Sequence, residues 1–408
     1  MRANQAPPKP VYLPARVGRC DEVAGDVMSR RIVILTEIIS PYRIPVFNAL
    51  AQQEGLALHV IFLAETDTAQ RQWRVYKDEM RFSYQVLPSW RWRMGTRNVL
   101  WNRGLRSALN RANPEAIICG GYNYFASWNA LFWARSHKVK FILWSESNRH
   151  DARGGYAWVE WLKAYFLEHC NSFVVPGQAS LEYLQSLGVA RESIVVAPDA
   201  VDNCWFQEQA ENIRARDPEF RQKLRLPDRF VLFAGRLIPE KGVFDLLEAY
   251  AKLDAEVRSK VGLVFAGDGI SRTELERRAK VISPGTICFP GFAHRENLAG
   301  FYAYAEALIL PTHSDPWGLV VNEAMACGLP IIVSSVAGCA PDLVEDGGNG
   351  YVVPPRDSVR LRAAIDSLVR NPELRQKMAA RSLERIRKHS PETCALGLAA
   401  AAGGRQVP

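Results

Sequence analysis

The chain lacks any run of 18 consecutive apolar residues, so the sequence predicts no membrane-spanning helix. Residues 1–27 are rich in proline and lack the apolar core of a secretory signal, and we expect a disordered tail or an upstream start there. The eight cysteines form no C-x-x-C pair and have no histidine at zinc-ligand spacing, which indicates neither a disulfide framework nor a structural zinc. These absences favour a protein that is neither exported nor inserted in a bilayer, and we expect it in the reducing cytoplasm.

Acidic residues are few in the segment 71–111, which holds ten Lys and Arg against Asp78 and Glu79. Its net charge of +8 equals the formal net charge of the whole chain. Four tryptophans are interleaved with these cations, namely Trp73, Trp90, Trp92 and Trp101. A basic, tryptophan-bearing face is typical of a protein that rests on an anionic membrane. Nucleic acid would suit the same charges, and a solvated face with a few core tryptophans is the plain structural interpretation.

The apolar pattern predicts an α/β fold made of two doubly wound, Rossmann-like domains that face a cleft. The 408 residues exceed one ordinary core, and 48% hydrophobic with 23% charged residues is typical of a globular chain. Short apolar runs alternate with helix-period segments, which is the pattern of parallel sheets covered on both faces. We expect strands at 32–36, 57–63, 116–119, 140–144, 172–175 and 193–197, and then at 230–234, 262–266, 286–289, 307–310 and 331–333.

The predicted division of the chain follows from the same pattern. The first domain spans 28–206, a polar and aperiodic linker region spans 207–225, and the second domain spans 226–371. A charged helix opened by Pro372 begins the last segment, 372–408, whose Ala/Gly-rich end from Leu396 we expect to be frayed.

The segment 310–330, LPTHSDPWGLVVNEAMACGLP, predicts a strand that runs into an acidic loop and then into a helix starting at Gly318. Asp315 lies on the loop and Glu323 about one and a half turns into the helix, so both carboxylates can point at the helix N-terminus. The backbone N–H groups of Gly318, Leu319 and Val320, together with the helix dipole, suit a phosphate. Carboxylates suit hydroxyls, and a phosphate beside a polyol indicates an activated sugar.

The second domain opens with FAGRLIPEKG, in which a strand ends at Ala234 and a short glycine-flanked loop follows. Arg236 and Lys241 place two cations at the C-terminal end of this strand, where they would suit the charge of a diphosphate. Taken alone the motif is equally compatible with a surface Arg and Lys, and the neighbouring acidic loop and helix make it informative.

Residues 229–357 resemble the donor-binding domain of retaining glycosyltransferases of family 4, which have the GT-B architecture. The matching motifs in chain order are GRLIPEKG, FAGDG, FPGF, the D-x7-E loop and helix, GLPIIVSSVAG and DLVEDGGNGYVVPPRD. The resemblance implies that 226–371 binds a nucleotide-sugar donor and that 28–206 lies on the acceptor side.

The resemblance also implies a role for each matched residue. Arg236 and Lys241 would bind the donor diphosphate and stabilise the leaving group, Glu323 would hold the ribose hydroxyls, and Asp315 would contact the transferred sugar. The remaining contacts would come from the helix N-terminus at Gly318, Leu319 and Val320, and from FPGF, including Gly291 and Phe292, which would line the base pocket.

The chain departs from the family pattern at two positions of the acidic loop. The family usually has Glu and Phe where this chain has Asp315 and Trp317. Asp is one methylene shorter, so its carboxylate falls back by about 1.5 Å. We therefore expect a donor sugar that sits differently or an altered activity.

The first domain offers three candidate residues. The opening SPYRIP resembles that of bacterial family members that build surface polysaccharides, and Arg43 within it is interpreted either as a phosphate contact or as a helix-capping surface residue. Many relatives place a His at the end of the strand that here reads FILWSESNRHD. We expect Glu146 to be the cleft residue in its place, with His150 second and a plain structural role as the alternative for both.

We therefore expect a retaining, metal-independent glycosyltransferase that moves a sugar from a nucleoside diphosphate to a hydroxyl acceptor, with Asp315, Glu146, Arg236 and Lys241 as its catalytic residues. No D-x-D motif occurs to hold a metal, no further cofactor is expected, and the Arg–Lys pair would have no purpose in a glycosidase. The basic segment suggests a lipid-linked or polysaccharide-precursor acceptor at the inner face of the cytoplasmic membrane, with no nucleic acid as partner. The alternatives are a nucleotide-sugar epimerase of similar fold, a basic nucleic-acid-binding protein, and a catalytically silent binder.

Overall fold

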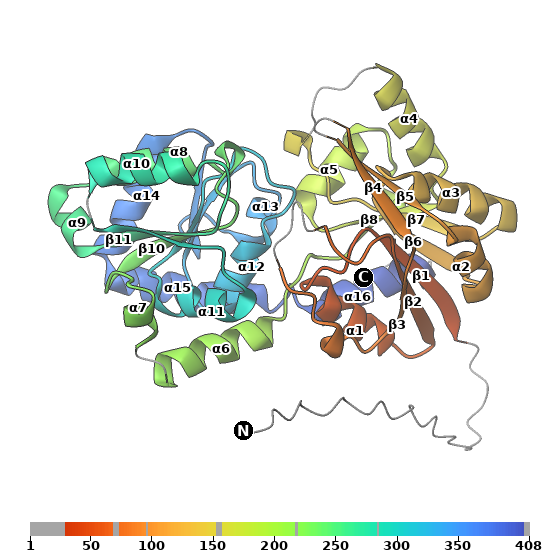
Figure 1. Cartoon of the computed structure of the whole chain (residues 1–408), viewed down its shortest axis with the longest axis horizontal. Coiled ribbons are helices and arrows are strands. Elements are labelled where there is room, and N and C mark those ends of the chain that lie inside the picture. The colour runs from red at the N-terminus through yellow and green to blue at the C-terminus, as the bar shows by residue number, and fades with distance from the viewer. Residues whose placement is uncertain are drawn as a thin grey trace, which may run out of the picture.

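The computed structural model describes residues 29–67, 73–94, 97–151, 157–216, 219–283 and 285–403, and the predicted tail at 1–27 lies outside them. Two α/β halves lie side by side, and the last helix returns to the half in which the chain begins (Figure 1). This architecture confirms the predicted pair of doubly wound domains. None of the helices in these ranges combines the length and apolarity needed to cross a bilayer.

The first half is built on a seven-stranded parallel sheet in the order β3-β2-β1-β6-β7-β8-β9. In β1, Ile32 and Ile34 are buried on one face of the sheet and Val33 and Leu35 on the other, which is why the strand reads as a continuous apolar run. The strands are β1 (Arg30–Thr36), β2 (Leu56–Phe62), β3 (Ser83–Val86), β6 (Ala116–Gly120), β7 (Lys140–Trp144), β8 (Ser172–Val175) and β9 (Ile194–Val196). The helices are α1 (Arg43–Ala51), α2 (Leu105–Ala112), α3 (Phe125–His137), α4 (Ala157–Glu168) and α5 (Gln178–Ser186), with single turns η1 (Lys77–Glu79), η2 (Arg149–Asp151) and η3 (Arg191–Ser193).

A separate antiparallel hairpin lies between β3 and α2 and was not predicted. It consists of β4 (Ser89–Met94) and β5 (Arg97–Asn102), and Trp90 lies opposite Trp101 in its register. The sequence obscured it because alternating Arg and Trp do not give the apolar alternation of an ordinary half-buried strand. The basic, tryptophan-bearing segment is therefore partly a defined structural element.

The second half is built on a six-stranded parallel sheet in the order β12-β11-β10-β13-β14-β15. Its strands are β10 (Phe230–Ala234), β11 (Gly262–Ala266), β12 (Ile287–Gly291), β13 (Leu308–Leu310), β14 (Ile331–Ser334) and β15 (Gly350–Val353). Its helices are η4 (Pro239–Lys241), α8 (Val243–Ala251), α9 (Ala255–Lys260), α10 (Arg272–Ile282), α11 (Arg295–Tyr304), α12 (Leu319–Ala326), α13 (Ala340–Leu343), α14 (Ser358–Arg370) and α15 (Pro372–Ile386). The five strands predicted here are confirmed within a few residues, and β15 was missed.

Two segments that we expected to be irregular are helical. The linker region contains most of α6 (Asn203–Arg216) and α7 (Phe220–Lys223), and the prediction of an aperiodic segment is wrong because Phe206 and Ala210 anchor α6 in the core of the second half. The prediction of a frayed end from Leu396 is wrong up to Gly403, because α16 (Pro391–Gly403) packs into the core of the first half. The lack of a side chain at Gly397 makes this possible, since an added Cβ would approach Ala197 to 2.7 Å.

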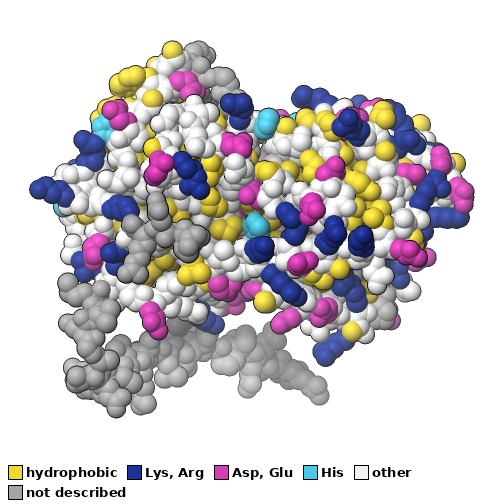
Figure 2. Space-filling model, turned by 180° about the vertical axis from the view of Figure 1, so that it is seen from behind, with side chains coloured by type: hydrophobic (Ala, Val, Ile, Leu, Met, Phe, Trp, Pro, Cys, Tyr) yellow, Lys and Arg dark blue, Asp and Glu magenta, His cyan; other side chains and the backbone are white. Residues whose placement is uncertain are grey.

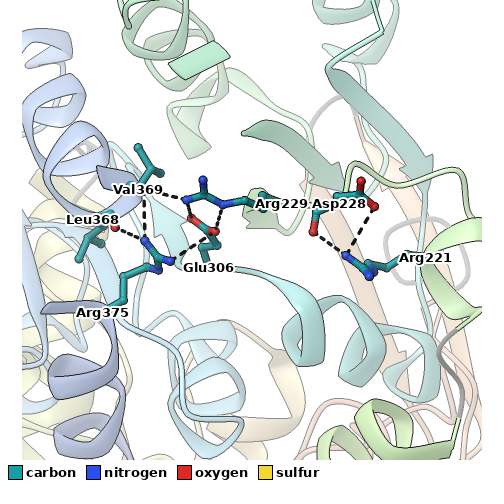
Figure 3. Close-up of polar contacts among 7 residues, drawn as sticks. All are labelled: Arg221, Asp228, Arg229, Glu306, Leu368, Val369 and Arg375. Atoms are coloured by element: carbon teal, nitrogen blue, oxygen red, sulfur yellow. Dashed lines mark hydrogen bonds and ion pairs between the residues drawn. The ribbon is translucent and has the colours of Figure 1, made fainter. Parts of the chain in front are cut away.

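A network of ion pairs and hydrogen bonds ties the end of α14 to the beginnings of two strands (Figure 3). Arg229, just before β10, pairs with Glu306, just before β13, at 2.5 Å between Nε and Oε1, and donates to the carbonyl of Val369 at 2.8 Å. Arg375 lies 3.5 Å from the same carboxylate and donates to the carbonyl of Leu368 at 2.6 Å. These strand beginnings lie at the sheet edge opposite the loops that follow β10 and β13, so the network serves the fold.

Candidate active site

The acidic loop after β13 and the Arg–Lys loop after β10 meet at the C-terminal edge of the second sheet. Gly242 ends the second loop with φ at +67°, and any Cβ there would overlap the carbonyl oxygen of Pro311. This close approach brings Lys241 Nζ to 2.5 Å from Asp315 Oδ2, with each side chain less than 15% exposed. The cation of one predicted motif and the carboxylate of the other therefore form one ion pair, and the shorter Asp side chain remains within the site.

The N-terminus of α12 lies immediately after this ion pair. Gly318 precedes the helix with φ at +104°, and a Cβ there would approach Leu310 to 2.8 Å, so a left-handed turn with no side chain is required. The first backbone bond of the helix runs from Val321 N to Gly318 O at 2.9 Å. The N–H groups of Gly318, Leu319 and Val320 precede it and have no acceptor inside the helix, which suits an anion.

Glu323 lies one turn further along α12 and is half-buried. Its Oε2 accepts a hydrogen bond of 2.7 Å from the hydroxyl of Tyr302 on α11. Burial raises the pKa of Glu323 from its ordinary 4.5 to about 7, and the Tyr302 hydrogen bond lowers it only partly. The side chain can therefore change its charge near neutral pH.

The other predicted donor-side residues surround the same loops. Arg236 is exposed on the loop after β10, and Gly267 and Gly269 of FAGDG allow a close approach to the backbone of that loop. Gly291 ends β12 with φ at +88°, and Phe292 after it is 41% exposed. The structure thus brings the predicted donor-side residues to one edge of one sheet.

Two asparagines that the sequence did not mark, one in each half, tie the acidic loop and α12 to the first half. Asn148, which is buried after β7, donates from Nδ2 to the carbonyl of Asp315 at 3.0 Å. Asn322 on α12 donates to the carbonyl of Asp199 at 2.9 Å and accepts from Trp317 Nε1 at 2.9 Å. Trp317 therefore makes a hydrogen bond that the usual family Phe could not make, and the loop is fixed from both sides. No spacing or composition signal marked these asparagines.

Arg43 and Glu146 are brought together in the first half. They form an ion pair, and the guanidinium of Arg43 also lies 3.1 Å from Asp199 and over the ring of Trp144 at 3.9 Å. Arg43 is buried, so the alternative of a surface residue is wrong. Burial by itself would lower the pKa of Arg43, but the nearby Asp199 carboxylate raises it above its ordinary value, and the guanidinium stays charged.

Glu146 keeps 40% of its side chain exposed, so its carboxylate is held by Arg43 and still reaches solvent. His150 is exposed in η2, and its backbone N–H donates to Asn148 Oδ1 at 2.8 Å. The structure therefore fixes Glu146 more firmly than His150. In the described ranges no group of three or more His, Cys, Asp or Glu side chains could hold a metal ion.

Comparison with known proteins agrees with this geometry. The fold is that of the GT-B glycosyltransferases: Anabaena HepE, crystallised with UDP and glucose, superposes with a TM-score of 0.71 over 92% of this chain and 99% of that one, at 16% identity. The family model for glycosyl transferases group 1 matches residues 216–385, and the model for glycosyltransferase family 4 matches residues 47–203. Together these models match most of the chain, which belongs to the family 4 type of glycosyltransferases.

The curated relatives described below match a little under half of the chain. The α-D-kanosaminyltransferase of Streptomyces kanamyceticus is 35% identical over 170 residues, which cover 40% of this chain and 43% of that protein. The D-inositol 3-phosphate glycosyltransferase of Frankia alni is 34% identical over 202 residues, which cover 46% of this chain and 49% of that protein. The chain thus spans about half the length of the curated relatives it matches.

Proposed function

We propose that this protein is a retaining glycosyltransferase that transfers a sugar from a nucleoside diphosphate to a hydroxyl acceptor in the cleft between its halves. One observation carries the proposal: the Lys241–Asp315 ion pair lies directly before the free N-terminus of α12, with Glu323 one turn further on. Cations and helix N–H groups suit a diphosphate, and carboxylates suit the hydroxyls of ribose and sugar. The family relationship supports the same assignment.

The proposed chemistry needs no protein nucleophile. The bond between sugar C1 and the diphosphate oxygen breaks while the acceptor oxygen bonds to C1 on the same face, and the acceptor proton passes to the departing diphosphate. Arg236, Lys241 and the helix N-terminus would stabilise the negative charge that develops on that leaving group. Glu146, fixed by Arg43, would orient the acceptor hydroxyl from the opposite side.

We also propose that transfer is independent of metal ions and of any cofactor other than the donor. The absence of a D-x-D motif supports this, and so do the two cations and the helix N-terminus, which can neutralise a diphosphate themselves. The prediction is that turnover persists in excess EDTA. A loss that Mg²⁺ or Mn²⁺ restores would contradict metal independence and leave the transferase assignment intact.

For the acceptor we propose a lipid-linked or polysaccharide precursor met at the inner face of the cytoplasmic membrane. The basic segment 71–111 supports this, although one of its arginines is neutralised within the protein. Arg91 is not a solvated cation, because it pairs with Asp67 at 2.6 Å and with Glu37 at 3.4 Å. The side chains of Arg93 and Arg97 lie outside the described part of the structure. The variants that test membrane binding therefore replace Arg103 and Arg106.

The test of the proposed function is a thermal-shift panel of nucleoside diphosphates and nucleotide sugars, starting with UDP and UDP-sugars. A donor at 100 times its Kd should stabilise the protein by about 2.7 kcal/mol, which is a shift of roughly 5–10 °C. One selective stabiliser is expected, and its shift should shrink in Arg236→Ala. Stabilisation by none of the nucleotides would refute the donor site, whereas an altered sugar nucleotide formed without acceptor would favour the epimerase alternative.

A further inference from the structure

The hairpin presents three tryptophans on one face. Trp90 lies opposite Trp101, and Trp92 follows two residues after Trp90, so all three rings share a face of the ribbon. They are between 47% and 55% exposed. The opposite face is anchored, since Leu100 is buried and Arg91 pairs with Asp67. The interpretation as core residues is wrong for these three tryptophans, which point outward while Arg91 points inward, and it holds for Trp73, which packs against the core of the first half.

The exposed aromatic surface continues from the hairpin onto two helices. Trp101 contacts Phe125, the first residue of α3, with ring centroids 5.8 Å apart. One turn later Trp128 contacts Phe132 at 6.2 Å and stacks on Tyr165 of α4 at 6.3 Å. Tyr165 in turn contacts Trp161, one turn earlier on α4, at 5.7 Å. These contacts make one surface of β4, β5, α3 and α4.

We call this surface the aromatic belt and define it by its exposed large side chains: Trp90, Trp92, Trp101, Phe125, Phe132, Trp158 and Trp161, each between 45% and 63% exposed. Figure 2 shows hydrophobic side chains gathered at the top of the first half, over α4. A contiguous patch of this kind is uncommon on a monomer with no partner and marks an interaction surface.

Exposed cations flank the hairpin end of the belt, whereas the α4 end carries the exposed Glu160 between Trp158 and Trp161. Between Glu79 and Glu146 the sequence has ten Lys and Arg, and Glu115 is its single acidic residue. Glu115 lies just before β6, at the opposite edge of the sheet, and pairs with Arg31 at 3.4 Å. Arg103 at the base of the hairpin and Arg106 on α2 are exposed. The charge around the hairpin is therefore complementary to an anionic surface.

The hairpin of the belt lies at the C-terminal edge of the first sheet, where Glu146 also lies. The hairpin follows the C-terminal end of β3, and Asn102 donates from Nδ2 to the carbonyl of Leu63, just after β2, at 2.5 Å. Its Arg91 reaches Glu37, which directly follows β1. Glu146 follows β7 at the same edge of this parallel sheet.

We propose that the aromatic belt docks the first half onto an anionic lipid bilayer, so that the acceptor side of the cleft opens at the headgroups. Tryptophans at an interface bury their rings at headgroup level, and flanking arginines bind anionic lipids. That the acceptor binds on the membrane-facing side rests on the proposed function, whereas membrane docking is measured without any donor or acceptor. Nucleic acid fits less well, because α4 offers Trp158, Trp161 and Glu160, while Lys163 beside them is bound to the Tyr183 hydroxyl at 2.5 Å.

The experiment measures sedimentation of the full chain with two kinds of vesicle, one of phosphatidylcholine alone and one that also contains about 30% of the anionic lipid phosphatidylglycerol. Trp158→Ser/Trp161→Ser should weaken binding to both kinds of vesicle, because apolar burial is lost. Arg103→Gln/Arg106→Gln should weaken only the anionic binding, by roughly thirtyfold for two cations near the surface. The matched control is Ile270→Ser/Val281→Ser, which removes exposed apolar side chains of the second half and should change nothing.

Two outcomes would overturn the proposal. One is that the unaltered chain does not sediment with anionic vesicles. The other is equal binding by the tryptophan variant and the control variant, each shown to be folded by its thermal transition. Binding of single-stranded DNA that depends on Trp158 and Trp161 while vesicles are ignored would assign the belt to nucleic acid. The nucleotide panel separates the two claims, since the belt variants should keep the donor's thermal shift, and vesicle binding without any nucleotide shift would refute only the proposed function.

Discussion

Replacing Trp317 by Phe tests whether the hydrogen bond that this chain adds to the family pattern holds the acidic loop in place. The indole N–H donates to Asn322 Oδ1 at 2.9 Å, and both side chains are buried, with Asn322 fully so. Phenylalanine would leave that carboxamide oxygen without its donor in the protein interior.

The expected cost follows from two terms. An unpaired buried acceptor costs about 1–3 kcal/mol, and the smaller ring loses roughly 1 kcal/mol of packing. The free energy of unfolding should therefore fall by about 2–4 kcal/mol, which lowers the thermal midpoint by roughly 5–15 °C. Turnover should fall with it, because Asp315 lies two residues before the ring and its carbonyl is held by Asn148.

The assay is a double-mutant cycle of Trp317→Phe, Asn322→Ala and the double variant, followed by urea unfolding. In the double variant the orphaned oxygen no longer exists, so its cost should be at least 1 kcal/mol smaller than the sum of the single costs. Additive costs, or a Trp317→Phe variant within about 0.5 kcal/mol of the parent, would refute the hydrogen bond as the reason for tryptophan here.

Three further predictions concern carboxylates. Asp315→Ala should abolish transfer while nucleoside diphosphate affinity, measured by calorimetry, changes little, and full turnover would contradict its assignment to the sugar. Burial raises the pKa of Glu323 in the folded protein to about 7, so the contribution of its neutral carboxyl to stability is fully present below pH 4.5 and is lost as the pH rises through 7. The free energy of unfolding, measured in urea, should therefore fall more steeply with rising pH in the parent than in Glu323→Gln. An equal pH dependence of the two proteins would contradict this assignment. Glu306→Ala should cost about 3 kcal/mol because it leaves two arginine partners unpaired, with the donor's thermal shift retained, whereas exposed Glu256→Ala should cost almost nothing.

Much of the fold was predictable because its signals are local. Strands 230–234 and 262–266 were predicted at the bounds of β10 and β11, since apolar side chains buried on both faces leave an unbroken run in the sequence. The glycines of the donor loops were readable for a related reason, as positive φ at Gly242 and Gly318 restricts the residue type at one position.

The first half was less predictable because its residues act through distant partners. Arg43 reads as a surface or phosphate-binding residue until the fold buries it between Glu146 and Asp199. The hairpin was missed because the arginine at position 91 faces inward to carboxylates on two other loops. Whether a side chain of such a strand points inward or outward depends on the partners that distant segments of the chain place beside it.

By itself the sequence determined two doubly wound domains and the donor-side motifs, because periodicity and glycine positions express the demands of the local backbone. The tertiary structure decided which distant groups are joined: Asn148 to Asp315 and Asn322 to Asp199 between the two halves, and α16 to the first half through Lys140 and Ala401. These partners are 123 to 261 positions apart in the chain. Contacts at that separation leave no periodic trace, since they depend on how whole sheets and helices pack.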